Sequence, residues 1–256
     1  MTADAPPTPG PSSINVAPGI VRLGSWLVNW YALEESGRVT VVDAGVSGYR
    51  KQLAPRLECL GRSEADVAAV VLTHAHPDHV GAAELLRTEL GVPVHVHEAD
   101  AELARTTKQS GKNEGSFLPY FRHATAWRLI AELLTHGGAK TRPIGAIETF
   151  MDGQELDVPG RLRVIHTPGH TDGHCALLFE AGSALFAGDA ICSLNPLTGS
   201  RGPQLMPSAF TRSTAQALAS LERLKGTGAS VMLPGHGEPI GEPDRAADEA
   251  KRRGPT

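Results

Sequence analysis

A short apolar run leads directly into a dense group of histidine and aspartate residues. Residues 67–72 read Val-Ala-Ala-Val-Val-Leu, and residues 73–79 read Thr-His-Ala-His-Pro-Asp-His. An uninterrupted apolar run of this length is typical of a buried strand. With 11 histidines in 256 residues, random placement would produce His-x-His-x-Asp-His in about one chain in a thousand. The chain must therefore fold around a strand that ends in a site for imidazole and carboxylate groups.

The spacing within this motif indicates two neighbouring metal ions. Side chains two residues apart point the same way at the end of a strand, so His74 and His76 can bind one ion together. The chain then turns at Pro77, so Asp78 and His79 can bind a second metal ion beside the first. The alternative, a cluster held by hydrogen bonds alone, would be costly to desolvate. We therefore expect a metal pair.

Three further candidate ligands lie in glycine-containing loops after apolar segments. They are His170 in Thr-Pro-Gly-His, Asp189 in Ala-Gly-Asp-Ala, and His236 in Pro-Gly-His-Gly. Glycine allows the backbone to turn tightly and brings a ligand close to a crowded centre. A single histidine in a loop is more often a solvated residue than a metal ligand. These three residues are candidate ligands because the motif at residues 74–79 is present in the same chain.

Together these motifs resemble the metallo-β-lactamase fold superfamily. The resemblance extends from the Val-Val-Asp-Ala-Gly segment at residues 41–45 to His236, with five motifs in the order found in that family. It implies an α/β fold, an αββα sandwich of two mixed sheets flanked by helices. It also implies a ligand set: His74, His76 and His170 for the first metal, Asp78, His79 and His236 for the second, and Asp189 as a bridge between both. Asp43 would orient the ligand loop.

The charge balance of such a site points to hydrolysis. Two divalent ions bring four positive charges, and Asp78 and Asp189 return two negative ones, so the site stays cationic. A bridging hydroxide would be available at neutral pH, because metal coordination lowers the pKa of water to about 7. Asp78 would pass a proton to the leaving group, which makes Asp78 and Asp189 the candidate catalytic residues. We predict cleavage of an ester, thioester, lactone or related bond in a small molecule, with two zinc ions and with iron or manganese as alternatives.

Departures from known subfamilies narrow this prediction. The chain ends soon after His236, without the C-terminal helical domain that binds glutathione in glyoxalase II, so we do not expect that activity. Asp189 resembles the bridging ligand of general hydrolases, whereas true metallo-β-lactamases have Cys or Ser at the equivalent place. Acyl-homoserine lactonases usually have a tyrosine shortly after this aspartate, where this chain has Ile191, Cys192 and Ser193.

Other functions stay open. A mononuclear iron enzyme similar to persulfide dioxygenases would use the same fold and related motifs, and elemental analysis separates it from a zinc hydrolase. A metal pair could also cleave a phosphodiester or RNA. A formal charge of -4 and the absence of a basic stripe count against a nucleic-acid partner. A non-catalytic metal scaffold is disfavoured because the ligand set is complete.

One domain accounts for most of the chain. Residues 1–13 form a Pro-rich stretch without Lys, Arg or an apolar run, which indicates a flexible tail and neither a signal peptide nor a membrane span. The metallo-hydrolase domain covers residues 14–240, with a helical insertion at about 100–147, and a polar tail that frays covers residues 241–256. Three scattered cysteines, Cys59, Cys175 and Cys192, favour a reducing compartment, the cytoplasm. The oligomeric state cannot be read from the sequence.

Hydrophobic periodicity predicts the elements around these motifs. An opening sheet of hairpins is followed by alternating helices and strands, and a helix begins beside Asp78. Ser213 and Gln216 resemble a capping box that opens a helix ending near Lys225. Expected strands cover residues 20–23, 26–33, 39–42, 67–72, 92–97, 161–165, 175–180, 183–186 and 230–233, and expected helices cover 49–60, 78–90 and 213–225.

Several further residues have a structural and a functional interpretation. His95 and His97 share one strand face, but we favour a half-exposed strand over a second metal pair. For His166 and His174 we expect local hydrogen bonds, and for Cys192 a place in the core. Arg201 is a candidate for binding a substrate carboxylate. Phe117, Tyr120, Phe121 and Trp127 could line a pocket, but we expect an apolar stripe, with Ala124, Ile130 and Leu134, to attach the insertion to the body.

Overall fold

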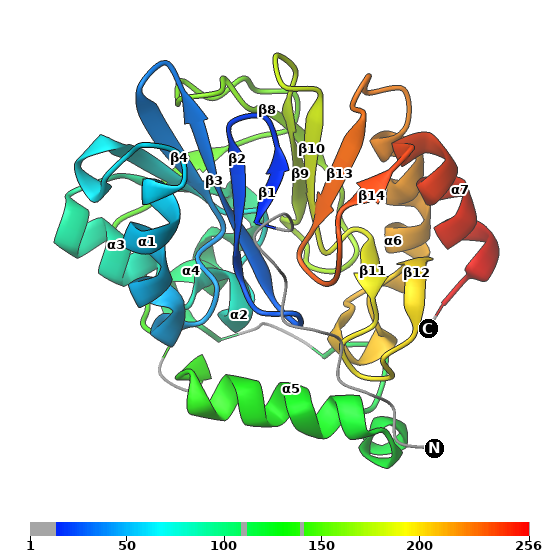
Figure 1. The fold of residues 1–256 in the computed structure, drawn as a ribbon. Helices are drawn as coiled ribbons and strands as arrows, with labels where there is room; N and C mark the ends of the chain where they lie inside the picture. The colour runs from blue at the N-terminus through cyan, green and yellow to red at the C-terminus, as the bar shows by residue number, and fades with distance from the viewer. Residues whose placement is uncertain (1–13, 109–111, 139–140, 256) are drawn as a thin grey trace.

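Two β-sheets pack face to face, and helices cover the outer face of each (Figure 1). The computed structural model describes residues 14–108, 112–138 and 141–255. The first sheet has the strand order β1-β2-β3-β4-β5-β6-β7, and the second has the order β14-β13-β10-β9-β8. The predicted αββα sandwich is thus confirmed. None of the described helices is long and apolar enough to cross a membrane.

The first sheet begins as an antiparallel meander and continues as parallel strands. β1 to β4 pair antiparallel, as the predicted hairpins require, and β5, β6 and β7 add in parallel. Parallel pairing needs crossovers, which contain the helices on the outer face. The strands are β1 Asn15–Ala17, β2 Ile20–Gly24, β3 Asn29–Glu35, β4 Arg38–Val42, β5 Val67–Val71, β6 Val94–His97 and β7 Glu148–Phe150.

The second sheet places two ligand-bearing loops side by side. β10 pairs in parallel with β13, and Gly188 at the end of one strand is in register with Pro234 at the end of the other. β11 and β12, which lie between β10 and β13 in the chain, form a separate two-stranded ribbon. The strands are β8 Arg163–His166, β9 Cys175–Phe179, β10 Ala184–Gly188, β11 Cys192–Leu194, β12 Arg201–Gln204, β13 Val231–Pro234 and β14 Ile240–Gly241.

Three apolar clusters correspond to the interfaces between the layers. The cluster between the sheets includes Tyr31, Leu33, Leu177, Phe186 and Leu233, all buried. A second cluster joins the first sheet to α1 and α3, and a third joins the second sheet to α6 and α7. The helices are α1 Leu53–Glu58, α2 Pro77–Val80, α3 Ala83–Leu90, α4 Ala101–Thr106, α5 Ala124–Thr135, α6 Thr214–Ser220 and α7 Pro243–Arg253; 3₁₀ helices cover Ser47–Gln52, Glu64–Asp66, Glu98–Asp100, Leu118–Arg122, Ser208–Phe210 and Leu221–Leu224.

The expectation of a frayed C-terminal tail is wrong, because residues 243–253 form helix α7. Pro243 stands in its first turn, where the missing N–H has no partner to lose. Ala246, Ala247 and Ala250 recur at helical spacing and are buried against the second sheet. The segment is polar on its other faces, and small alanine side chains on one face suffice to dock it. The tail predicted at residues 1–13 lies outside the described residues.

Helix α5 lies across the end of the sandwich at which the histidine loops gather (Figure 1). It belongs to the segment predicted as a helical insertion, in which the described residues include α4, the 3₁₀ helix Leu118–Arg122 and α5. The expected apolar stripe does not bury itself. Ala126 and Leu129 are the buried residues of α5, whereas Trp127 and Leu134 are 56% and 67% exposed. The buried face of α5 therefore lies beside the expected stripe, of which Ile130 is half-buried.

Candidate metal centre

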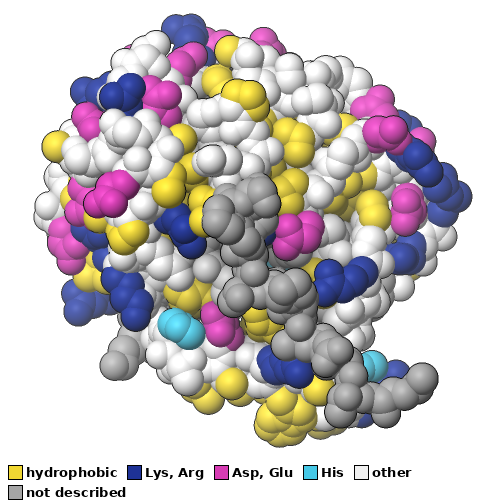
Figure 2. Space-filling model, in the orientation of Figure 1, with side chains coloured by type: hydrophobic (Ala, Val, Ile, Leu, Met, Phe, Trp, Pro, Cys, Tyr) yellow, Lys and Arg dark blue, Asp and Glu magenta, His cyan; other side chains and the backbone are white. Residues whose placement is uncertain are grey.

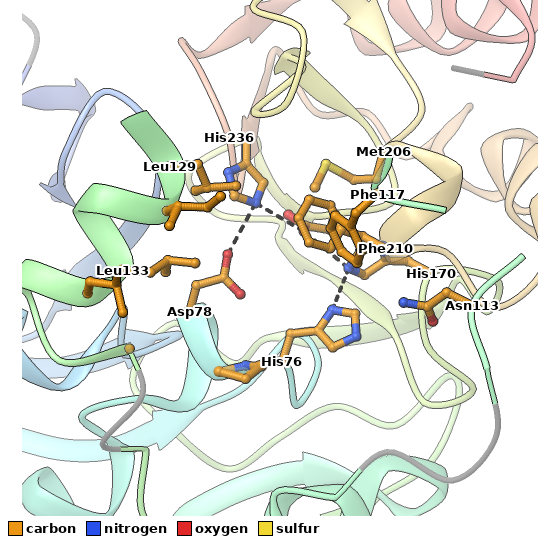
Figure 3. Close-up of a pocket in the computed structure, with 15 residues that line it drawn as sticks. His76, Asp78, Asn113, Phe117, Leu129, Leu133, His170, Met206, Phe210 and His236 are labelled. Carbon is orange, nitrogen blue, oxygen red and sulfur yellow. Dashed lines mark hydrogen bonds and ion pairs between the residues drawn. The ribbon is translucent and has the colours of Figure 1, made fainter. Parts of the chain in front are cut away.

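Seven imidazole and carboxylate groups from four parts of the chain converge at one end of the sandwich. Their ligand atoms form three groups, each with atoms within 4.8 Å of one another. Figure 3 shows four of the side chains, His76, Asp78, His170 and His236, pointing toward one another at the base of a pocket. The groups are His74, His76 and His170; His74, His79 and Asp189; and Asp78, His79 and His236.

Asp189 lies at the centre of the cluster. Its Oδ2 atom is 3.2 Å from Nε2 of His170 and 3.2 Å from Nε2 of His236. Its Oδ1 atom is 3.5 Å from Nε2 of His79. The carboxylate therefore contacts residues expected for both metals, which is the position that a bridging ligand requires.

Strand ends and one helix start supply these side chains. His74 and His76 follow β5, and Asp78 and His79 stand in the first turn of α2, where Pro77 is compatible with helical geometry. Asp189 and His236 directly follow the paired strands β10 and β13. Because parallel strands end at the same edge of a sheet, these two ligands become neighbours.

Three histidines are held by one ring nitrogen so that the other faces the cluster. Nδ1 of His79 lies 2.9 Å from a carboxylate oxygen of Asp43, and Nδ1 of His74 lies 3.0 Å from Oγ1 of Thr73. Nδ1 of His236 contacts the carbonyl oxygen of Leu27. This arrangement fixes the ring and leaves Nε2 available, as is usual for metal-binding histidines.

The buried atoms of the cluster fit a metal centre. Among the described residues, Nε2 of His74, His79 and His236 and Oδ1 of Asp189 are buried without a hydrogen-bond partner. Such groups cost free energy unless something satisfies them. Gly235 completes the fit, since a Cβ atom there would lie 2.2 Å from Oδ1 of Asp189 and 2.6 Å from Cε1 of His79. The donor set of imidazoles and carboxylates suits zinc.

The electrostatics of the cluster favour positive charge beside Asp189. Burial lowers the pKa of His74 and His76 well below the usual range, which leaves neutral imidazoles able to bind a cation. Burial opposes protonation of His79, but Asp189, Asp43 and Asp78 raise its pKa to about 10. Burial also opposes ionisation of Asp189, yet His236 and His79 hold the pKa of that carboxyl well below its ordinary value. Metal binding would therefore release protons from this cluster.

Asp43 lies against the loop that begins at Thr73. Its carboxylate accepts hydrogen bonds from the backbone N–H of Thr73 (2.8 Å) and from the Thr73 hydroxyl, and it contacts His79. Asp43 itself has a φ of 59°, an uncommon conformation for a residue other than glycine. Such outliers often accompany functional sites.

Asp100 is a residue of the site that sequence reasoning missed. It is buried, and its carboxylate accepts hydrogen bonds from the backbone N–H of Ala75 (3.0 Å), the Thr171 hydroxyl (2.7 Å) and the backbone N–H of Gly173 (2.8 Å). Burial raises the pKa of this carboxyl, while these hydrogen bonds favour the charged form. Asp100 therefore joins the loop of His74 and His76 to the loop of His170. No local sequence signal marks it.

Side chains of the first sheet hold the loop that carries His236. Asn29 donates hydrogen bonds through Nδ2 to the carbonyl oxygens of Pro234 (2.9 Å) and Gly237 (2.6 Å). The Tyr31 hydroxyl also donates to the Pro234 carbonyl, and Arg22 donates to the Gly237 carbonyl. The two sheets thus fix a metal-binding loop jointly. The sequence separations exceed 200 residues, so no local pattern could have revealed these contacts.

His174 and His166, which flank His170 in the sequence, make different contacts. The expected hydrogen bonding of His174 includes Asp189 itself, because Nε2 of His174 accepts a 2.8 Å hydrogen bond from the backbone N–H of Asp189. Burial lowers the pKa of His174 to about 3, so the ring stays neutral and can accept. His166 instead contacts the Asp172 carbonyl and stacks on His97, with ring centroids 4.3 Å apart.

The remaining candidates lie outside the cluster. Among the described residues, no group of potential metal ligands includes His95, His97 or Cys192. Cys192 is buried, as expected, and its thiol donates to the Leu205 carbonyl. Arg201 is exposed on β12 and does not line the pocket beside the metal centre, so the structure gives no support to its proposed role in binding a carboxylate.

A cavity of about 500 Å³ opens beside the cluster, between α5 and the metal-binding loops. Its wall includes Phe117, which contacts Phe210 with ring centroids 5.1 Å apart. The expectation that the insertion's aromatic residues attach it to the body is therefore mostly wrong. Phe117 lines the cavity, and Phe121 and Trp127 are exposed, whereas Tyr120 packs partly buried on the core.

Comparison with known proteins points in the same direction as this geometry. A family model described as the metallo-beta-lactamase superfamily matches residues 23–236. The probable metallo-hydrolase YflN of Bacillus subtilis (strain 168) is 26% identical over 244 residues, which cover 90% of this chain and 88% of that protein. A beta-lactamase-like protein 2 homolog of Drosophila melanogaster is also 26% identical, over 84% of this chain and 60% of that protein.

Solved structures show the same fold. The metallo-beta-lactamase family protein TTHA1429 from Thermus thermophilus is 33% identical with a TM-score of 0.64, over 92% of this chain and 79% of that one. The metallo-beta-lactamase SMB-1, solved with mercaptoacetic acid, has a TM-score of 0.66 over 93% of this chain and 92% of that one. At 16% identity, the second likeness concerns the fold alone.

Proposed function

Because the chain belongs to the metallo-beta-lactamase superfamily, we propose that it is a hydrolase that cleaves an ester, thioester, lactone or related bond with two divalent metal ions. The observation that carries this proposal is the convergence of seven ligand-type side chains, with buried unpaired atoms, beside an open cavity. Zinc is the metal that this imidazole and carboxylate set suits best. The buried free cysteines Cys175 and Cys192 suit a reducing compartment, and we place the protein in the cytoplasm.

We assign His74, His76 and His170 to one metal and Asp78, His79 and His236 to the other, with Asp189 between them. When bound, such ions lower the pKa of water and polarise the carbonyl oxygen of a substrate. Asp43, Thr73 and Leu27 hold the histidine rings in the orientation that ligation requires. His174 holds Asp189 through the backbone.

Asp78 is the residue that we propose as proton donor to the leaving group. Its side chain is 20% exposed and lines the cavity, whereas that of Asp189 is 2% exposed. One carboxylate oxygen of Asp78 lies 3.6 Å from Nε2 of His236. Asp78 is therefore the more accessible of the two carboxylates to a substrate in the cavity, where it would pass a proton to the leaving group.

The cavity weighs against phosphodiester or RNA cleavage, one of the alternatives. Among the described residues that line it there is no Lys or Arg, the residues that usually bind phosphate. A mononuclear iron oxygenase is the other alternative, and the metal content of the protein distinguishes it.

The test combines metal analysis with a substrate panel. Protein purified without chelator is analysed for zinc, iron and manganese, then stripped, reconstituted and offered ester, lactone, thioester and phosphodiester substrates. About two zinc ions per chain and metal-dependent cleavage of a carbonyl substrate would support the proposal. One iron per chain with oxygen consumption would replace it with the oxygenase alternative. An Arg201→Ala variant serves as a control outside the cavity and should retain full activity.

A further inference from the structure

We propose that the non-reacting part of the substrate is an uncharged apolar group, an acyl chain or a ring of similar size, held between α5 and the metal centre. This inference rests on the proposed hydrolase function for the reaction and adds the class of substrate. Four features of the cavity carry it: the chemistry of its wall, its charge, the way α5 is fixed and the exposed apolar side chains at its mouth.

Among the described residues, the wall of the cavity away from the metal centre is apolar except for Asn113. Figure 3 shows Leu129 and Leu133 on one side of the ligand cluster and Phe117, Met206 and Phe210 on the other. A volume of about 500 Å³ is enough for a small organic molecule. The apolar side chains that line the cavity are Pro77, Phe117, Leu129, Ile130, Leu133, Leu134, Met206 and Phe210.

The charges around the cavity disfavour an ionised substrate tail. Among the described lining residues, the ionisable groups are the histidines and aspartates of the ligand cluster, and no cationic Lys or Arg side chain is present. Asn113 adds a neutral amide, and its Nδ2 donates a 2.8 Å hydrogen bond to the Ala209 carbonyl. A carboxylate far from the metals would lose its hydration without gaining a cationic partner, which is unfavourable.

Contacts after the last turn of α5, and in the segment that precedes the helix, hold α5 over the cavity, so its apolar face forms a fixed wall. His136 and Gly137 follow the last turn of α5. The Gly137 carbonyl accepts a 2.8 Å hydrogen bond from the Ser47 hydroxyl, and the His136 carbonyl accepts one of 2.8 Å from the backbone N–H of Gly48. The Tyr49 hydroxyl donates to Glu132 within the helix. In the segment before the helix, the backbone N–H of Gly115 donates to the Ser208 carbonyl (2.9 Å).

The mouth of the cavity is apolar as well. Leu134 and Phe117 line the cavity and are 67% and 42% exposed. Figure 2 shows hydrophobic side chains along the lower edge of the molecule, in the region where Figure 1 places α5. Clustered exposed apolar side chains of this kind mark binding surfaces more often than plain surface. An apolar substrate would meet matching surface from the entrance to the metal centre.

The first experiment measures kcat/KM of the metal-reconstituted protein for p-nitrophenyl acetate, butyrate, hexanoate and octanoate. Each added methylene group should raise kcat/KM about threefold to fourfold while it is buried in the cavity. A chain of the same length that ends in a carboxylate, the mono-p-nitrophenyl ester of suberic acid, should be a poorer substrate than the octanoate. Equal rates for acetate and octanoate, or a preference for the carboxylate-ended ester, would overturn the proposal.

A matched pair of variants tests the position of the group. Leu134→Lys places a cation at the mouth, whereas Leu118→Lys makes the same change at a residue that is 76% exposed and does not line the cavity. Leu134→Lys should lower kcat/KM for the octanoate at least about tenfold and favour the carboxylate-ended ester, because a pocket contact is replaced by a charge. Leu118→Lys should leave both values unchanged. Identical behaviour of the two variants would place the apolar group elsewhere.

A binding measurement separates failure of this inference from failure of the proposed reaction. The fluorescence of the neutral probe N-phenyl-1-naphthylamine reports occupancy of the cavity in the stripped protein, with no catalysis required. Octanamide should displace the probe at lower concentration than acetamide, and Leu134→Lys should weaken probe binding. If no ester is cleaved but this displacement holds, the reaction is wrong and the specificity stands. If esters are cleaved without chain-length preference and the probe does not bind, the specificity is wrong.

Discussion

The carboxylate of Asp100 accepts a 2.7 Å hydrogen bond from the hydroxyl of Thr171, although 71 residues separate the two along the chain. The same carboxylate accepts from the backbone N–H groups of Ala75 and Gly173. Three donors from two ligand-bearing loops thus meet on one buried side chain. The relative position of those loops, and with it the distance between His76 and His170, depends on this residue.

Asp100→Asn should weaken metal binding about tenfold to a hundredfold, the range typical of residues that hydrogen-bond the surroundings of metal ligands. The amide keeps the shape but replaces one accepting oxygen with an NH₂ group, so at least one of the three donors loses its partner. Competition for zinc against a chromophoric chelator measures the affinity. The control is Glu102→Gln on the exposed side of α4, which should bind zinc as the unaltered protein does. Equal affinities for both variants would contradict the role of Asp100.

Asp189→Ala should abolish turnover and lower zinc retention by more than the roughly hundredfold effect of a change outside the ligand set. The carboxylate lies 3.2 Å from both His170 and His236, so its loss removes an anion that both metal positions share. The far-ultraviolet circular dichroism spectrum should be unchanged, because the sheets and helices do not depend on this side chain. Activity, zinc per chain and the spectrum are measured together. Unchanged turnover would rule out a bridging role.

Gly235→Ala should impair metal binding and lower the free energy of unfolding by about 1–3 kcal/mol, the usual cost of overpacking. The added Cβ atom would lie 2.2 Å from Oδ1 of Asp189, so the carboxylate or the His236 loop must move. Gly241→Ala is the matched control, since nothing lies within 4 Å of a Cβ atom there. Zinc titration measures the metal affinity of both variants, and urea unfolding measures their free energy of unfolding. Full zinc affinity in Gly235→Ala would show that the ligands do not need this space.

His97 should make stability fall as the pH is lowered. Burial lowers the pKa of His97 and the neighbouring His166 lowers it further, while Glu98 and Asp152 oppose the shift. The unfolded chain, with a histidine pKa of about 6.5, then binds more protons than the folded one below that pH. The contribution is complete above about pH 6.5 and is lost as the pH falls toward the lowered value.

The measurement compares urea unfolding of the unaltered protein and His97→Gln between about pH 8 and about pH 5.5, a window that spans the ordinary histidine pKa. The variant should lose less stability over this range, because it lacks the proton uptake of His97 on unfolding. Histidines that do not contact His97 are present in both proteins, so their effect cancels, and the difference reports His97 together with His166, which stacks on it. Parallel curves would show that protonation of His97 does not oppose folding.

The sequence by itself determined the elements that depend on neighbouring residues. The apolar run at residues 67–72 predicts β5 because an uninterrupted apolar run is a pattern of neighbouring residues, and the glycines of the loops at Asp189 and His236 mark tight turns for the same reason. The capping box suggested at Ser213 is seen in part, since the Ser213 hydroxyl accepts from the backbone N–H of Gln216 at the start of α6. The motif order also allowed the fold to be predicted, and the fold is confirmed.

Only the tertiary structure decided which groups surround those motifs. Asp100 and Asn29 act on loops that are distant in sequence, and their partners are backbone groups, which every residue carries and no pattern can single out. The same holds for α5, because a helical pattern shows which residues repeat but not which face meets the body. Leu129 is buried and Trp127 is exposed because contacts after the last turn of the helix, and in the segment before it, hold the helix over the cavity. Packing between distant segments, and not local preference, sets the surroundings of this site.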